Sequence, residues 1–238
     1  MKPAFYALEG GGWRDYLTLL HVPYTAWHLS YVVVGGCLAA EVAWGRLGLT
    51  VLAFFLAMGI GAHALDELAG RPLGTAIPSS VLVVLALISL VAACVIGLTV
   101  AVGFSLWILP LVAIGAFLVP AYNLELFGGR FHSDAWFAVA WGAFPVITGY
   151  VAVDGTPRIV AFVAAGWAAA LSLAQRRLST PVRRARREIV SVEGEIVLAG
   201  GDREPITREL LVSAPEDALR LLAVATVLIA AALVVIRL

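Results

Sequence analysis

Pro72–Leu124 reads PLGTAIPSSVLVVLALISLVAACVIGLTVAVGFSLWILPLVAIGAFLVPAYNL and contains no charged residue. A helix crosses the apolar part of a membrane in roughly 20 residues. The stretch is therefore too long for one crossing and must fold back on itself. The glycines from Gly97 to Gly103 mark the expected turn. We expect one span at Pro78–Ile96 and the next at Phe104–Ala121.

The composition of the whole chain has the same character. The 238 residues are 61% hydrophobic and 13% charged, and the mean hydropathy is +0.95. Soluble domains are about 45–50% apolar and about 25% charged, so a soluble globular fold is excluded. Disorder is excluded too, because the chain has so much apolar surface to bury. The apolar runs are continuous rather than alternating, which favours helices over a membrane β-barrel.

Further apolar runs indicate five more spans, at Tyr24–Ala43, Leu47–Leu65, Ala135–Val153, Arg158–Gln175 and Ala218–Ile236. The expected fold class is therefore all-α, a polytopic transmembrane helical bundle of about seven spans. We expect residues 1–175 to hold spans one to six, residues 176–216 to form a cytoplasmic polar insert, and residues 217–238 to hold the last span.

The basic residues orient this bundle. With the N-terminus and the polar insert in the cytoplasm, only Arg46, Arg158 and Arg237 of the 16 lysines and arginines fall outside. Cytoplasmic loops are enriched in lysine and arginine. The sequence therefore predicts a multi-pass plasma membrane protein with a cytoplasmic N-terminus, and the odd number of spans agrees with this distribution.

The polar insert has the pattern of a small β-hairpin. Glu188–Leu198 is rich in strand-forming residues, Gly200–Asp202 suits a turn, and Ile206–Val212 could return as a second strand. Ser213 then suits a helix N-cap before the last span. The arginines at Arg183–Arg187 either contact anionic lipid headgroups or act only as a topology anchor.

Ionisable residues at membrane depth are costly and are usually functional. Eight of them, including all four histidines, fall toward the predicted cytoplasmic side: His21, His28, His63, Asp66, Glu67, Glu125, His132 and Asp134. His63, Asp66 and Glu67 share one helical face by their spacing. Three separate segments thus present histidines and carboxylates at one level.

Histidine and carboxylate side chains are the usual ligands of Zn, Fe and Mn, whereas carboxylates alone suit Mg. They also serve in acid–base catalysis. Each residue has an ordinary alternative: Asp66 and Glu67 could pair with Arg71, and Asp134 could be a helix N-cap. Because all eight gather on one side, we expect a cytoplasm-facing polar site.

Two segments resemble the UbiA superfamily of intramembrane prenyltransferases. Gly59–Pro78, GIGAHALDELAGRPLGTAIP, is similar to the first aspartate-rich segment of that family, and Trp141–Gly149, WGAFPVITG, resembles the helix that follows its inner loop. The resemblance implies a helical bundle with a cytoplasm-facing cavity. Members of the family hold a prenyl diphosphate through Mg²⁺ and transfer the prenyl group to an acceptor, with the tail in an apolar groove open to lipid.

The resemblance also implies site residues. Asp66 matches the later aspartate of the first motif, and His63 stands where the earlier one is expected; with Glu67 these form the predicted catalytic group. The predicted substrate contacts are Arg71, Tyr122, Asn123 and Arg130. The second aspartate-rich motif is replaced by residues 175–181, QRRLSTP, which contain no carboxylate.

The sequence leaves three functions open. The first is a UbiA-like enzyme acting on an isoprenoid or other lipid, with Mg or Mn as cofactor. The second is an oxidase, hydroxylase or hydrolase with Fe or Zn on the histidines. The third is a transporter or assembly subunit without activity. The expected partners are membrane lipids and no nucleic acid, and Gly35, Gly36, Gly59 and Gly61 permit close packing within the chain or in a homo-oligomer.

Overall fold

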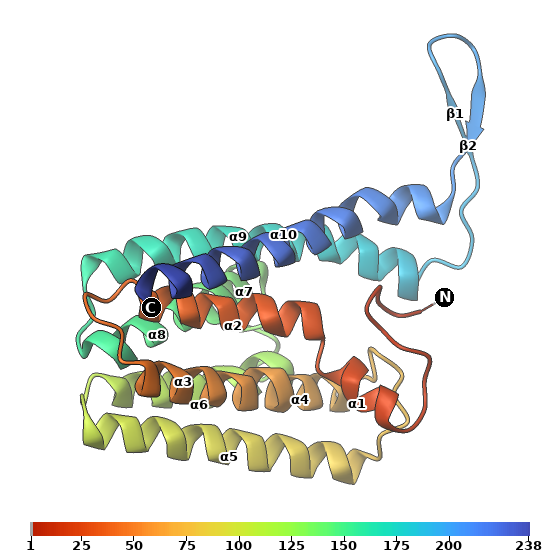
Figure 1. The fold of residues 1–238 in the computed structure, drawn as a ribbon. Coiled ribbons are helices and arrows are strands. Elements are labelled where there is room, and N and C mark those ends of the chain that lie inside the picture. The colour runs from red at the N-terminus through yellow and green to blue at the C-terminus, as the bar shows by residue number, and fades with distance from the viewer. Residues whose placement is uncertain (1) are drawn as a thin grey trace.

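A computed structural model describes residues 2–238, of which most are helical, and so confirms the all-α class. The longer helices run side by side, with their connections gathered at two ends (Figure 1). The elements in chain order are α1 Trp13–Leu19, α2 Val22–Cys37, α3 Trp44–Phe54, the π-helix η1 Phe55–Ala62, α4 His63–Leu68, α5 Ser79–Gly103, α6 Ile108–Asn123, α7 Asp134–Ala138, the π-helix η2 Val139–Ala143, α8 Phe144–Asp154, α9 Ile159–Arg187, β1 Glu195–Val197, β2 Arg203–Pro205 and α10 Arg208–Arg237.

Five helical segments are long and apolar enough to cross a membrane. They are Trp44–Leu68, Ser79–Gly103, Asp134–Asp154, Ile159–Arg187 and Arg208–Arg237. The other two expected spans correspond to α2 and α6, which have 16 residues each. The chain is therefore a helical protein with membrane-spanning character, and the structure supports five of the seven expected spans by length and composition.

The turn after α5 differs from the expected position. The helix continues through Gly97 and ends at Gly103, and the connection to α6 follows at residues 104–107. The side chain of Val112 fills the space beside Gly97, where a Cβ would lie 2.6 Å from Val112 Cγ2. Gly97 therefore serves the packing of α5 against α6 and does not break the helix.

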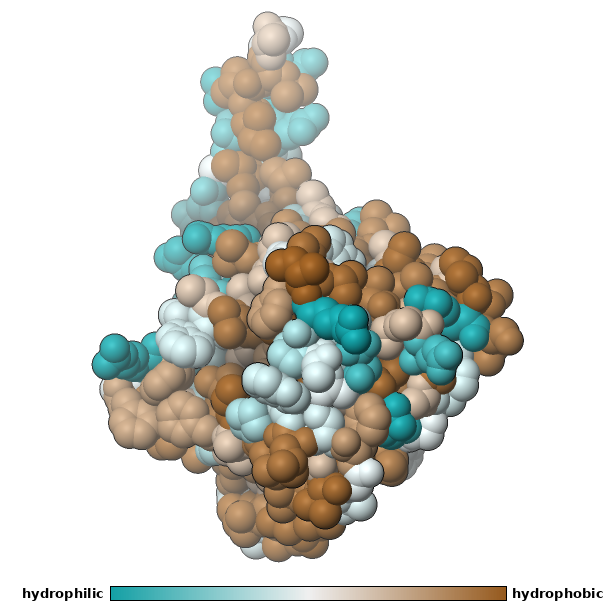
Figure 2. All heavy atoms as spheres, turned by 90° about the vertical axis from the view of Figure 1, so that its left-hand side faces the viewer, coloured by the Kyte–Doolittle hydropathy of each residue, from teal (hydrophilic) through white to brown (hydrophobic). Residues whose placement is uncertain are grey.

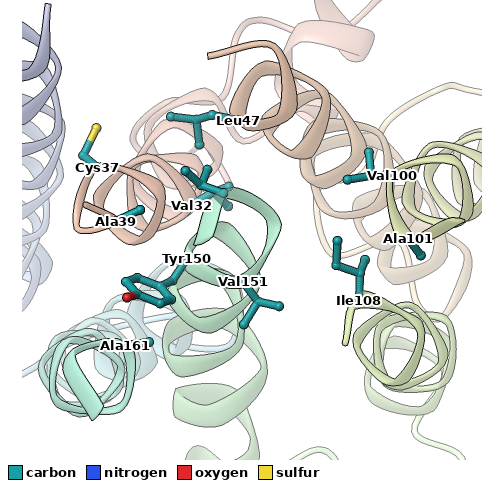
Figure 3. Close-up of a cluster of buried hydrophobic side chains, with 11 residues drawn as sticks. Val32, Cys37, Ala39, Leu47, Val100, Ala101, Ile108, Tyr150, Val151 and Ala161 are labelled. Carbon is teal, nitrogen blue, oxygen red and sulfur yellow. The ribbon is translucent and has the colours of Figure 1, made fainter. Parts of the chain in front are cut away.

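The centre of the bundle is the crossing of α2 and α8. Gly35 and Gly149 face the carbonyl groups of Val146 and Val32, so closely that a Cβ on either glycine would clash with the opposite backbone. Around this crossing, Val32, Tyr150 and Val151 pack with residues of α3, α5, α6 and α9 (Figure 3). Small residues thus allow two backbones to touch, and larger apolar side chains fill the space around them.

Three arginines lie at the end of the bundle opposite the hairpin. Arg46 donates to the carbonyl groups of Ala152 and Val153 (3.1 and 2.9 Å), and Arg237 donates to two carbonyl groups at the C-terminal end of α2 (2.9 and 3.0 Å). Arg158 pairs with the last residue of α8. These are the cations that complement helix C-termini. Figure 2 looks onto this end and shows hydrophilic side chains with hydrophobic ones around them.

The polar insert is shorter than expected, because the flanking helices extend into it. α9 continues to Arg187, and α10 already begins at Arg208 with Thr207 as its N-cap. The hairpin is confirmed, but its second strand is Arg203–Pro205 and not Ile206–Val212. Ser213 lies inside α10 and is no cap. Val212 packs on Val182 of α9, and this contact favours helix over strand.

The α2–α8 crossing yields a stability prediction. Gly35→Ala places a methyl group against the Val146 carbonyl, and we expect a loss of about 1–3 kcal/mol in the free energy of unfolding. Gly48→Ala is the matched control, because nothing lies within 4 Å of its Cβ position. The control should be neutral or gain up to about 1 kcal/mol. Thermal unfolding in detergent micelles measures both, and equal transitions for the two variants would contradict this account of the crossing.

Candidate functional site

A polar cavity of about 520 Å³ lies at the end of the bundle near the N-terminus. It is lined by six of the eight ionisable residues singled out from the sequence and by the last two residues of α6: His21, His28, His63, Asp66, Glu125, His132, Tyr122 and Asn123. Residues from η1 and η2 also line it. π-helical segments are frequent at functional sites, so the local backbone agrees with a site here.

Two histidines from different elements form a stacked pair inside the cavity. The rings of His21 and His63 lie 4.0 Å apart between centroids, at 16°. His63 Nδ1 lies 3.0 Å from the carbonyl oxygen of Gly59 and donates to it, because a carbonyl can only accept. The Nε2 of His63 therefore carries a lone pair that is free to accept a proton or bind a ligand.

His21 is held in an unusual state. It precedes α2 in the left-handed conformation, with φ of 46°, which is strained for a residue with a side chain. Burial lowers the pKa of His21 well below its ordinary value of 6.5, and the imidazole of His63 and the guanidinium groups of Arg187 and Arg183 lower it further. The His21 ring is therefore neutral at neutral pH.

His28 lies deeper among aromatic rings. Its Nε2 is 3.0 Å from Oε1 of Gln175, and both side chains are buried. The rings of Phe137 and Trp141 lie 6.0 and 6.4 Å from the His28 ring between centroids. The inner part of the cavity is thus aromatic, with one polar pair in it.

The wall formed by α6 and the loop after it carries a chain of contacts. Tyr122 stacks on His132 with 4.5 Å between centroids, and His132 Nδ1 donates to the Tyr122 carbonyl oxygen at 3.0 Å. Nη2 of Arg176 lies 3.4 Å from His132 Nε2, and Nε of Arg176 lies 3.2 Å from Oδ1 of Asp134. Asp134 therefore positions Arg176 and does not line the cavity itself.

Glu67 also lies outside the lining. One carboxylate oxygen accepts from the backbone N–H of Leu73 (3.0 Å), and the other accepts from the N–H and hydroxyl of Thr75 (2.8 and 2.9 Å). The side chain is buried. Glu67 thus holds the loop after α4 in place, and its oxygens are occupied by protein donors.

The two predicted arginine contacts lie elsewhere as well. Arg71 donates to the Ile77 carbonyl oxygen and to the Ser79 hydroxyl, each at 2.6 Å, so its guanidinium folds the same loop. Arg130 is not among the residues that line the cavity. Among residues 2–238, four residues other than glycine have a positive φ: His21, Arg71, Glu125 and Phe127. The first three are among the site residues predicted from the sequence.

The sequence does not predict that α9 contributes to this site; it predicts that Arg183–Arg187 contact lipid headgroups or act as a topology anchor. Gln175, Arg176, Ser179, Arg183 and Arg187 all line the cavity. Their spacing of three or four residues places them on one face of a helix. The predicted polar insert at residues 176–216 does not show this shared face, whereas a helix that continues past Gln175 does. The N-terminal segment supplies Tyr6, whose pKa is raised by burial.

A second, apolar pocket of about 100 Å³ adjoins the first. It lies among α3, η1, α5, α6 and α8, and its lining is almost wholly apolar. Met58 and Trp141 line both spaces. The polar cavity and the apolar pocket therefore share these two side chains in their linings.

Comparison with known proteins gives no relative of this chain. No protein family, no curated protein and no solved structure matches it. Within residues 2–238, the side chains of histidine, cysteine, aspartate and glutamate form no group of three placed to hold one metal ion.

The contacts of Glu67 predict a structural role that can be measured. Glu67→Ala leaves two buried N–H groups and a hydroxyl without an acceptor, so we expect a loss of about 3 kcal/mol or more in the free energy of unfolding. Glu193→Ala, at an exposed position, should stay within about 0.5 kcal/mol of the wild type. Thermal unfolding in detergent compares them, and an unchanged Glu67→Ala transition would refute the assignment.

The state of His21 predicts a dependence on pH. The unfolded chain binds a proton at His21 below about pH 6.5, whereas the folded chain resists it. Stability should therefore fall as the pH drops from 7 to 5, by up to about 1.4 kcal/mol per pH unit. His21→Asn keeps a residue that tolerates a positive φ and removes the titration. Unfolding transitions across this range should fall less steeply for the variant; parallel curves would disprove the role of His21.

Proposed function

We propose that this chain is an integral membrane enzyme that acts on an isoprenoid or similar lipid, as the UbiA resemblance implies. The observation that carries the proposal is the junction at Met58 and Trp141, where a polar cavity meets an apolar pocket. An amphiphile needs both environments, one for its headgroup and one for its tail. The junction offers them in immediate succession.

We further infer seven crossings with the cavity facing the cytoplasm. Each 16-residue helix, α2 and α6, is about 24 Å long at 1.5 Å per residue, and a hydrocarbon core is about 30 Å thick. Short helices suit a thinned bilayer or helix ends extended by loops. The distribution of basic residues supports this orientation. All except Arg46, Arg158 and Arg237 lie in segments that the predicted topology places on the cytoplasmic side, and cytoplasmic segments are enriched in lysine and arginine.

The polar cavity has groups for proton transfer. His63 has a free Nε2, and Asp66 lies one turn further along the same helix face and also lines the cavity. A neutral imidazole beside a carboxylate can take a proton from the molecule that receives the prenyl group, and the carboxylate then stabilises the imidazolium. We assign this role to His63 and Asp66.

The Mg²⁺ that the resemblance implies does not match this donor set. Mg²⁺ prefers oxygen ligands in octahedral geometry, usually with one or two carboxylates and substrate phosphates. Asp66 is the one carboxylate that is not exposed in the lining, and Arg183 and Arg187 line the same space. Two guanidinium charges beside one carboxylate disfavour a divalent cation.

A second candidate rests on the stacked pair His21 and His63. A neutral imidazole whose other nitrogen is bonded to a carbonyl is the usual form of a transition-metal ligand. No three histidine, cysteine or carboxylate side chains of residues 2–238 are placed to hold one ion as they stand, so the two rings and Asp66 would have to move to bind Fe or Zn. With that movement the chain would be a lipid-directed metalloenzyme. Elemental analysis of the purified protein beside His63→Ala/Asp66→Ala decides it: metal present in the wild type and absent in the variant would favour this candidate.

The tail pocket yields the test of the main proposal. Met58→Trp enlarges a side chain at the junction, and we expect the affinity for farnesyl diphosphate to fall at least about tenfold, because the tail loses its place. Inorganic diphosphate binding should be unchanged. Leu87→Trp, on an exposed side of α5, is the control. Equilibrium binding of radiolabelled probes to detergent-purified protein measures each. Farnesyl diphosphate that binds no more tightly than inorganic diphosphate would contradict a tail site.

Activity is tested separately by following the release of diphosphate from farnesyl diphosphate in the presence of membrane extract, which supplies acceptors. Asp66→Asn should abolish the release while leaving the binding of the lipid intact. A variant with full activity would rule out the assignment of Asp66.

A further inference from the structure

We propose that the cavity holds the phosphate groups of its ligand directly, through Arg183, Arg187 and the hydroxyl of Tyr122, without a metal ion. The identity of the ligand as a lipid rests on the proposed function. The anion site itself rests on three observations about the side chains of α6 and α9.

The first observation is an unpaired hydroxyl. Tyr122 is 5% exposed, it lines the cavity, and its hydroxyl has no hydrogen-bond partner among residues 2–238. A buried polar group without a partner is costly and needs an explanation. A ligand oxygen in the cavity provides one, because the phenol can donate to it.

The second observation concerns the arginines of α9. Arg176 and Arg177 pair with Asp134, and Arg186 pairs with Glu216. Arg183 and Arg187 form no salt bridge within the described residues, and both line the cavity. Guanidinium groups bind phosphate with two parallel hydrogen bonds.

The remaining contacts of these two arginines are weak. Arg183 donates to the Thr180 hydroxyl at 3.3 Å, and Arg187 donates to the Pro3 carbonyl oxygen at 3.4 Å. Both distances are long for hydrogen bonds of this kind. Each guanidinium therefore keeps donors that a ligand could take.

The third observation is the position of the acidic groups in the lining. The side chain of Glu125 is 65% exposed and lies 3.8 Å from Nδ1 of His132, and Glu188 is exposed. Asp66 is the remaining carboxylate. Arg187 is exposed as well, whereas Arg183 and Asp66 are partly buried. The lining thus holds two guanidinium groups without a salt bridge, at Arg183 and Arg187, and one carboxylate that is not exposed, and we expect this balance to favour an anion.

The site replaces the one that the resemblance implies. At the place of the second aspartate-rich motif the chain has Gln175–Pro181, and Arg183 and Arg187 follow within the next two turns of α9. Fixed guanidinium charges supply the positive charge that Mg²⁺ would otherwise bring. Diphosphate recognition should therefore not require an added cation.

The test measures binding of inorganic diphosphate and farnesyl diphosphate to purified full-length protein, with and without EDTA. We expect EDTA to leave both affinities unchanged. Arg183→Gln and Arg187→Gln should each weaken both probes at least about tenfold, and the effect should shrink at high salt. Tyr122→Phe should weaken binding without lowering the unfolding temperature, because the hydroxyl has no protein partner. Arg177→Gln, outside the lining, is the matched control.

The binding results separate the anion site from the lipid function. Binding that is lost in EDTA and restored by Mg²⁺ overturns the inference, and so do unaffected arginine variants. Farnesol binding as tightly as farnesyl diphosphate also overturns it, although the tail site of the proposed function would stand. Inorganic diphosphate that binds in an arginine-dependent manner, with no contribution from the tail, supports the inference while the proposed lipid function fails.

Discussion

The backbone contact between α2 and α8 is the constraint on which the rest of the structure depends. Gly35 and Gly149 bring the two chains together so closely that neither can carry a side chain there. This crossing fixes the start of α2, where His21 and His28 lie, relative to η2, where Trp141 lies. The crossing thus fixes the relative positions of two helical segments that carry site residues, as a rigid binding site requires.

Part of the fold follows from the sequence alone. Hydropathy identifies helical segments near the observed ones, and Gly200–Asp202 correctly indicates the hairpin turn. The errors have a common physical origin, since they arise where tertiary contacts override local signals. Gly97 has the character of a helix breaker, but it lies inside α5 and leaves room for the side chain of Val112. Ser213 has the character of an N-cap, but it lies inside α10, which packs against α9. The number of crossings stays a prediction.

The sequence also predicts part of the site, namely the residues that line the cavity from α2, α4 and the segment after α6. The sequence predicts that the histidines and Asp66 lie toward one end of the bundle, and all of them line the cavity. The sequence could not show that the Glu67 carboxylate accepts hydrogen bonds from the backbone N–H groups of Leu73 and Thr75, because the positions of these donors depend on the conformation of the loop. Nor could it show the contribution of α9, since charged residues after an apolar run are equally compatible with a loop and with a helix beyond the membrane.

The apolar cluster of Figure 3 has a consequence for transport across the bilayer. The apolar pocket beyond the polar cavity borders Val100 and Ile108, two members of that cluster, and past them lies the end closed by Arg46 and Arg237. Among residues 2–238, a charged group that leaves the polar cavity in this direction would meet an almost wholly apolar lining, in which Thr50 and Thr148 carry the hydroxyl groups. Removing that charge from water without new partners is costly, so the apolar lining opposes its passage from the polar cavity toward the end at Arg46 and Arg237.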